Sequence, residues 1–372
     1  MSQPPSGPFR PTLTSVQGLR GFALLLVILV HQSFVEKKYG HVEPMLVKTH
    51  LEQFNHAAVD VFLVISGFII AYTTFEAFGG RRNALSFLYR RLTRIYPPWW
   101  FYSLLVMPVF FFFPQMVNSA EGNQVDLLRS FFLLPSEHLP IIPIAWTLTF
   151  ELYFYVGFAF LVALPRSRLG PMIALWALVM LGFIAVGAAG YQGGPVFRLL
   201  SNPISLDFML GVCVAMALQR GPARQPRLLI IAGLVLWLGG YAAYVFFVGD
   251  WLVNHYSRVF IAGVPAALLI YGMVSIEATG GRNPMGRLKW FGDTSYSTYL
   301  CHVLIVVGIG RLWYMWGPTG QVAHWTWLIG SIAIAVYVGG LSYKYVEKPI
   351  LRWAKRHDPT VERPPAAVRS AT

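Results

Sequence analysis

Long apolar stretches recur along the whole chain, each about as long as a helix that crosses a bilayer. Such a helix needs about 20 mostly apolar residues, and ten segments meet this requirement. They cover residues 13–34, 57–78, 99–117, 146–164, 171–190, 203–218, 228–248, 259–276, 294–313 and 325–346. Since lipid offers the backbone no hydrogen-bond partners, the pattern predicts an all-α, polytopic integral membrane protein with about ten transmembrane helices.

Composition leaves little room for a second, soluble domain. Hydrophobic residues make up 56% of the chain and charged residues 12%, about half the charged share of a soluble protein. We therefore expect a leader over residues 1–12, one transmembrane domain over 13–348 and a tail over 349–372. The first span lacks a small-residue cleavage site, so we expect it to stay uncleaved.

The basic residues predict the orientation of the spans. With ten spans both ends of the chain lie on one side, and 22 of the 29 Lys and Arg residues fall on that side. Cytoplasmic loops carry such an excess, which predicts cytoplasmic N- and C-termini. The same arrangement accounts for the net charge of +13 without a nucleic-acid partner. Cys213 and Cys301 have no metal-ligand spacing, and no metal site is expected.

The first span carries an arginine and a histidine on one helical face. Arg20 and His31 are eleven residues apart, about three turns and about 16 Å along a helix. Ionisable groups inside a span are costly and are candidates for function, so we expect both to face one polar channel. Arg20 as a snorkelling flank residue and His31 as a packing or interfacial residue remain alternatives.

The second span begins with an acidic residue at the depth where His31 leaves the first. Asp60 would then orient the imidazole of His31 and make it a better general base. A helix N-cap is the alternative for Asp60.

Three arginines precede the third span. Arg90, Arg91 and Arg94 have helical spacing, and a short helix ending at Pro97 would present them at the cytoplasmic surface. Guanidinium groups bind phosphate oxygens bidentately, so the cluster could hold the nucleotide of coenzyme A. An ordinary positive-inside anchor is the alternative.

Further polar residues lie within the later spans. Glu151 starts the fourth span, more than a turn below the outer surface, and would bind sugar hydroxyls, pair with an imidazole or form a structural pair. Tyr296, Tyr299 and His302 share helical spacing in the ninth span, where packing and pore lining are both open. Two long outer loops, 35–56 and 118–145, would be lids or partly inserted hairpins.

Six motifs in order resemble the acyltransferase 3 family of membrane O-acyltransferases over nearly the whole chain. They are Arg-x10-His, Val-Asp-Val-Phe-Leu-Val-Ile-Ser-Gly-Phe, Arg-Arg-Leu-Thr-Arg-Ile-Tyr-Pro, Trp-Thr-Leu-Thr-Phe-Glu, Ser-Tyr-Ser-Thr-Tyr-Leu-Cys-His and Tyr-Val-Glu-Lys-Pro. The resemblance implies transfer of an acyl group, usually acetyl from acetyl-CoA, to a hydroxyl of a glycan or other acceptor. His31 matches the family's essential histidine, Arg20 its paired arginine, and Arg91 with Arg94 its Arg-x-x-Arg.

These interpretations give one hypothesis for function. Arg20, Arg90, Arg91 and Arg94 bind the cytoplasmic acyl-CoA, and His31, Asp60 and Glu151 act on an acceptor glycan of an exopolysaccharide that enters from outside. A bacterial cytoplasmic (inner) membrane is the expected location, and polysaccharide-synthesis proteins or a second copy are open as partners. The alternatives are a transporter or flippase that makes no bond, and a structural subunit of a polysaccharide synthase.

Overall fold

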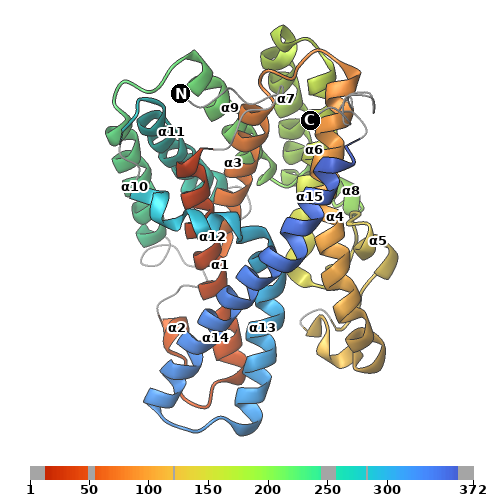
Figure 1. Cartoon of the computed structure of the whole chain (residues 1–372), viewed down its shortest axis with the longest axis vertical. Helices are drawn as coiled ribbons and strands as arrows, with labels where there is room; N and C mark the ends of the chain where they lie inside the picture. The colour runs from red at the N-terminus through yellow and green to blue at the C-terminus, as the bar shows by residue number, and fades with distance from the viewer. Residues whose placement is uncertain (1–12, 49–54, 120–121, 244–256, 282–283, 359–372) are drawn as a thin grey trace, which may run out of the picture.

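The computed structural model describes residues 13–48, 55–119, 122–243, 257–281 and 284–358. Its helices, which Figure 1 labels where there is room, are α1 (Thr14–Tyr39), α2 (Met45–Lys48), α3 (Asn55–Thr73), α4 (Arg81–Phe112), α5 (Leu127–Phe131), α6 (Trp146–Ala163), α7 (Leu169–Ala188), α8 (Pro195–Leu200), α9 (Ser205–Arg220), α10 (Pro226–Ala243), α11 (Val264–Ala278), α12 (Lys289–Asp293), α13 (Ser295–Trp316), α14 (Gln321–Ser342) and α15 (Lys348–Arg356).

The described residues confirm the predicted class of fold. They contain nine helices long and apolar enough to cross a membrane, and Ala57–Thr73 of α3 adds a shorter apolar helix. Each of the ten predicted spans coincides with one of these helices. The protein is therefore an all-α integral membrane protein, whereas the predicted leader 1–12 and the end of the tail, from residue 359, lie outside the described residues.

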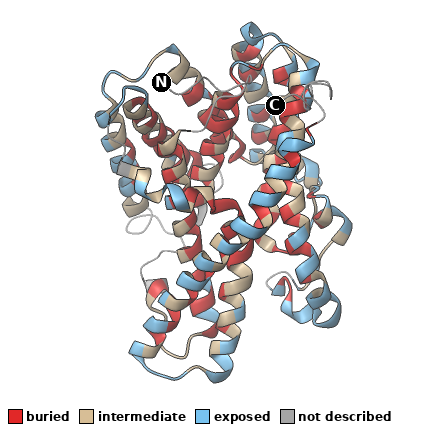
Figure 2. Ribbon diagram, in the orientation of Figure 1, coloured by how far each residue is buried: buried red, intermediate tan, exposed pale blue. Residues whose placement is uncertain are grey.

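Helix α1 is the central helix of the bundle. It contacts α3, α11, α12 and α13, and buried residues follow it through the middle of the molecule in Figure 2. The backbone N–H groups of Thr14 and Ser15 donate to Glu277 of α11 at 2.8 and 2.7 Å. A carboxylate from a neighbouring helix thus satisfies donors that the first turn of α1 cannot pair internally.

Helices α3 and α9 pack against each other at two glycines. A Cβ on Gly67 of α3 would collide with the carbonyl oxygen of Phe208, and one on Gly211 of α9 would collide with that of Val64. Small residues let transmembrane backbones approach closely where apolar burial gives no driving force. This contact holds α3 in place next to α1, and so sets the position of Asp60.

The prediction that the arginine-bearing helix ends at Pro97 is wrong. Helix α4 continues through Pro97, Pro98 and Pro108 to Phe112. Prolines are tolerated in transmembrane helices because neighbouring groups satisfy the backbone atoms that they free. Beside the first two prolines, the hydroxyl of Tyr296 donates to the carbonyl oxygen of Ile95 at 2.9 Å.

The second long outer loop is inserted along α4. The indoles of Trp99 and Trp100 donate to the carbonyl oxygen of Phe131 at 3.2 and 3.1 Å, and the hydroxyl of Tyr96 donates to that of Phe132 at 2.9 Å. Tyr96 precedes the end of α4 by sixteen residues, or about 24 Å of helix. Part of this loop therefore packs well inside the length of α4 instead of lying beyond its end.

The last described helices continue one another. Helix α14 passes through a π-helical turn over Tyr343–Glu347 directly into α15. This long helix crosses the view of Figure 1 obliquely, and α15 packs against α4. It brings Asp358 to the first turns of α4, where its carboxylate pairs with Arg90.

Candidate active site

Three arginines from two helices line one small pocket inside the bundle. Arg20 of α1 meets Arg91 and Arg94 of α4, with Glu151 of α6 in the same wall. The pocket has a volume of about 50 Å³. Arg91 and Arg94 are three residues apart and therefore lie on one face of α4. The tyrosines Tyr155 and Tyr296 and apolar residues of α3 complete the lining.

The pocket carries an excess of positive charge. Arg20 donates to the amide oxygen of Gln17 at 3.1 Å and Arg91 to the hydroxyl of Thr73 at 3.2 Å, both neutral acceptors. Glu151 accepts from the hydroxyl of Tyr155 at 3.1 Å. In the described part of the chain no carboxylate lies within ion-pair distance of Arg20, Arg91 or Arg94. Buried Glu347, in the π-helical turn after α14, also acts electrostatically on Arg20 and Arg94. Three guanidinium groups near two carboxylates leave one positive charge in excess, which suits the binding of an anion.

Glu151 lies with these arginines rather than with an imidazole. The inserted loop explains this difference, because α6 begins well below the outer end of the molecule and Glu151 reaches the depth of Arg91 and Arg94. Of the three alternatives given for Glu151, pairing with an imidazole is therefore not the one found.

Arg90 is separated from the other two arginines of α4. Its Nε donates to Asp358 at 3.0 Å, and 44% of its side chain is exposed. It is absent from the lining of the pocket. The predicted single cluster is thus divided, because Asp358 binds Arg90 while Arg91 and Arg94 line the pocket with Arg20.

His31 lines a different and much larger cavity. This outer cavity has a volume of about 660 Å³ and lies between α1, α4, α13 and the segments 116–119 and 139–144. Most of its walls are apolar, with Val106 of α4 and Val303 of α13 among them. His31 contributes a partly buried imidazole to this cavity.

Hydrogen bonds to backbone carbonyls determine the tautomer of His31. Its Nδ1 lies 2.9 Å from the carbonyl oxygen of Val27 in the preceding turn. A carbonyl oxygen only accepts, so Nδ1 carries the proton. In the neutral ring Nε2 therefore has a free lone pair, which is what a general base requires.

A second histidine packs against the first. The ring centroids of His31 and His302 are 5.0 Å apart, and the rings meet edge to face. Nδ1 of His302 lies 2.7 Å from the carbonyl oxygen of Tyr299. Its buried Nε2 has no hydrogen-bond partner among the described residues. The sequence spacing noted for the ninth span includes His302, but nothing in that spacing pairs it with His31.

The predicted contact between Asp60 and His31 is wrong. Asp60 is fully buried and accepts from Nε and Nη2 of Arg258, with distances of 3.1 and 2.7 Å to Oδ1. The carboxyl of Asp207 lies beside this pair. The approximate depth of Asp60 was predictable, but α3 turns this residue toward α9 and residue 258 instead of toward α1. Asp60 is neither a free N-cap nor an orienting group for His31.

Tyr299 closes the bundle between the two cavities. Its hydroxyl lies 2.7 Å from the carbonyl oxygen of Ile144 and 2.8 Å from the hydroxyl of Thr147. On α13, Tyr296 lines the arginine pocket and Val303 the outer cavity, with Tyr299 between them. The expectation that Arg20 and His31 face one continuous channel is therefore wrong for this structure.

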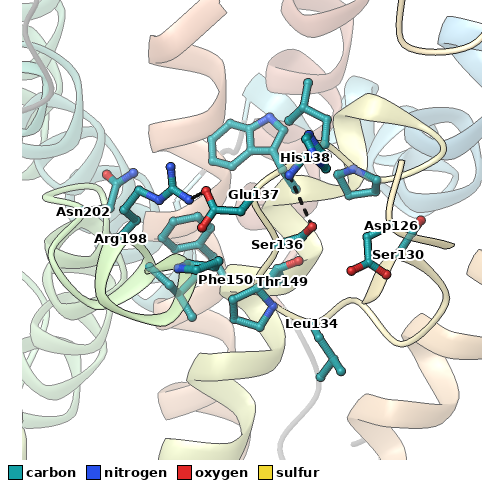
Figure 3. A pocket seen from close by; sticks show the side chains of 16 residues that line it. Asp126, Ser130, Leu134, Ser136, Glu137, His138, Thr149, Phe150, Arg198 and Asn202 are labelled. Atoms are coloured by element: carbon teal, nitrogen blue, oxygen red, sulfur yellow. Dashed lines mark hydrogen bonds and ion pairs between the residues drawn. The ribbon is translucent and has the colours of Figure 1, made fainter. Parts of the chain in front are cut away.

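A separate groove lies on the other side of the inserted loop (Figure 3). Glu137 of this loop and Arg198 of α8 form an ion pair across it. His138 points into the same groove, and Leu139 lines both the groove and the outer cavity. The ion pair thus links α8 to the loop that forms one wall of the outer cavity.

Comparisons with known proteins identify the family of the chain. A family model described as an acyltransferase domain matches residues 13–344. The chain belongs to the acyltransferase 3 family. It is similar to the acyltransferase MdmB of Streptomyces mycarofaciens, at 27% identity over 96% of this chain and 97% of the relative. It also resembles the exopolysaccharide production protein ExoZ of Rhizobium meliloti, at 27% identity over 80% and 89%.

A third relative is longer than this chain. The O-acetyltransferase OatA of Staphylococcus aureus is 22% identical over 91% of this chain but only 57% of its own length. No solved structure matches the chain. Membership of the family confirms the resemblance drawn from the six motifs, and it establishes that this acyltransferase 3 protein is an acyltransferase embedded in a membrane.

Proposed function

We propose that this protein transfers an acyl group, acetyl in the first instance, from cytoplasmic acetyl-CoA to a hydroxyl of a glycan on the outer side of a bacterial cytoplasmic membrane. The observation that carries the proposal is the free Nε2 of His31 in the outer cavity, on the same helix that sends Arg20 into the arginine pocket. The names of the relatives, an exopolysaccharide production protein and an O-acetyltransferase, support a glycan hydroxyl as acceptor.

The arginine pocket is suited to an anionic part of the donor. Guanidinium groups bind phosphates through paired N–H donors, and Arg20, Arg91 and Arg94 face one pocket. Its volume of about 50 Å³ is smaller than a nucleotide. The surrounding helices must therefore separate when the donor enters, and the acyl-bearing arm of the donor then extends toward His31.

Proton transfer and acyl transfer take place at His31. Nε2 removes the proton of the acceptor hydroxyl, and the resulting alkoxide attacks the carbonyl carbon of the thioester. The carbon–sulfur bond breaks, and the thiolate of coenzyme A takes the proton from the imidazolium. An acyl-histidine intermediate is the variant route, which labelled acetyl-CoA without acceptor would trap on His31.

Replacement of His31 by alanine tests the proposal directly. We expect His31→Ala to lower acetyl transfer by about 10²- to 10⁴-fold, the usual contribution of a general base. The assay measures release of free CoA and acetylation of the glycan by mass spectrometry, using purified protein. His41→Ala is the matched control, since His41 is a half-buried histidine beyond the cavity, whose Nε2 donates to the carbonyl oxygen of Tyr314 at 3.1 Å. Full activity of His31→Ala would rule out this mechanism.

The same assay separates the proposal from its alternatives. A transporter or flippase would release no CoA, and a structural subunit would tolerate His31→Ala. The family of the chain favours bond-making over transport. Polysaccharide-synthesis proteins, or a second copy of the chain, are proposed partners that supply the acceptor.

A further inference from the structure

Two cationic side chains lie in the outer part of the cavity that His31 lines. Lys38 of α1 and Arg311 of α13 both line it. The lining includes no aspartate or glutamate, so its fixed charge among the described residues is positive. In a cavity with mostly apolar walls, charges are screened less than in water. The cavity therefore favours the binding of anionic ligands over cationic ones.

The positions of the two cations relative to His31 are set by their helices. Lys38 is seven residues after His31 on α1, which is about 10 Å along the axis and nearly the same face. Arg311 is nine residues after His302 on α13, or about 13 Å. Both cations therefore lie further out than the two imidazoles, at a distance longer than one sugar ring.

Both side chains keep donors that their neighbours do not use. Lys38 donates to the hydroxyl of Ser119 at 2.9 Å. Arg311 donates to the hydroxyl of Tyr39 at 3.3 Å and to the carbonyl oxygen of Met116 at 3.1 Å. All three acceptors are neutral. An ammonium has three N–H donors and a guanidinium five, so each cation can still bind an anion.

We propose that the acceptor is an anionic glycan, whose negative group binds between Lys38 and Arg311 while its reacting hydroxyl lies at His31. The inference rests on the proposed acyl transfer to a glycan and names the chemical class of that glycan. The distance along α1 puts the anion on a different sugar from the one that is acylated. The anion is either a carboxylate on the glycan or the phosphate that links it to a lipid carrier.

The test uses the full chain in vesicles of zwitterionic lipid, with acetyl-CoA supplied and acceptor-dependent release of CoA measured. The acceptors are repeating units of the host's own exopolysaccharide, first stripped of acetyl groups with mild alkali. They are compared as native units, as carboxyl-reduced units and as lipid-linked units with and without the phosphate. Lys38→Gln and Arg311→Gln are the test variants. Lys37→Gln is the matched control, because Lys37 is exposed on α1 but does not line the cavity.

We expect each test variant to raise KM for the anionic acceptor about tenfold, the usual scale for a hydrogen bond to a charged group, with little change in kcat. In the unmodified protein, neutralising the anion should raise KM more than either single variant does, because both contacts are lost. Each single variant should respond less to this change than the unmodified protein, and the double variant Lys38→Gln with Arg311→Gln should not respond to it. A response to carboxyl reduction identifies the carboxylate, and a response to loss of the phosphate identifies the lipid link.

Equal KM values for charged and neutral acceptors would overturn this proposal while leaving acyl transfer intact. So would a host glycan that has neither carboxylate nor phosphate and is still acylated efficiently. Loss of all CoA release in the unmodified protein, by contrast, would contradict the proposed function itself.

Discussion

The backbone carbonyl of Val27 does for His31 what we expected the carboxylate of Asp60 to do, and His302 is held in the same way. Val27 holds the Nδ1 proton of His31, and Tyr299 holds that of His302. Each imidazole is bonded to its own preceding turn, an interaction that needs no particular side chain. Sequence inspection could therefore identify His31 as a candidate base but could not identify what orients it.

Asp60→Asn tests whether Asp60 acts through His31 or through Arg258. Removing one charge of a buried pair costs about 3–5 kcal/mol, because Arg258 is only 4% exposed. We expect a large loss of thermal stability in detergent, with the pH dependence of kcat in the folded fraction unchanged. A shifted pH profile with normal stability would instead revive the predicted contact with His31.

Asp293→Asn is the matched control for stability. Asp293 pairs with Lys289, whose side chain is 51% exposed. Solvent-exposed ion pairs contribute about 0–1 kcal/mol, so this variant should unfold close to the temperature of the unmodified protein.

At the scale of elements, Tyr299 on α13 and Thr147 at the start of α6 determine whether the two cavities communicate. On α13, Val303 lines the outer cavity and Tyr296 the arginine pocket. The chain likewise runs from Ile144, in the wall of the outer cavity, into α6, whose Glu151 lines the arginine pocket. In the proposed reaction, the acyl-bearing arm of the donor must pass Tyr299 and Thr147 to reach His31. Opening therefore requires these helices to move apart, or the tyrosine side chain to turn away from Ile144.

Tyr299→Phe should weaken this closure. It removes the hydroxyl that contacts Ile144 and Thr147, and each such hydrogen bond contributes about 1 kcal/mol. We expect CoA release in the absence of acceptor to rise about fivefold, because water gains access to the thioester. The measurement is hydrolysis of acetyl-CoA by purified protein, with Tyr314→Phe, an exposed tyrosine at the outer end of α13, as control. An unchanged rate would show that Tyr299 is not the barrier.

The helices themselves were predictable from sequence, because each needs only an apolar run of sufficient length. Their ends were less predictable. The end expected at Pro97 fails because a membrane helix can continue through proline when its neighbours satisfy the backbone. How far in Glu151 lies, with Arg91 and Arg94, was not predictable, since this depends on the insertion of the 118–145 loop, which leaves no mark in the local pattern of residues.

Which residues belong to the site was more predictable than which of them contact one another. Arg20, Arg91 and Arg94 line one pocket, as expected of residues that bind the same donor, but Glu151 lies with them although the sequence assigned it to the acceptor. Arg90 and Asp60 are instead taken by partners far away in the sequence, Asp358 and Arg258. Long-range pairings of this kind depend on how the helices pack, and a single sequence does not encode them in a readable way.

At the scale of the whole molecule, the proposed reaction requires the arginine pocket to open toward the cytoplasm and the His31 cavity to open outward. The excess of Lys and Arg on one side predicts this orientation. Two single-cysteine variants, Lys37→Cys and Arg168→Cys, test this orientation. Each is made in a chain whose Cys213 and Cys301 are replaced by alanine.

A membrane-impermeant maleimide added to intact cells should label the cysteine at position 37 and leave that at position 168 unlabelled until the cells are opened. Both positions are exposed in the structure. The reverse result would invert the orientation, and with it the sides from which donor and acceptor enter.

The closure at Tyr299 also has an electrical consequence. A water-filled passage from cytoplasm to exterior would conduct protons and ions and would run down the voltage that the membrane maintains. In the proposed reaction, the contacts of Tyr299 keep this passage closed except while the acyl-bearing arm of the donor occupies it. Acyl transfer as proposed would then modify a glycan outside the cell with a donor made inside, without discharging the membrane.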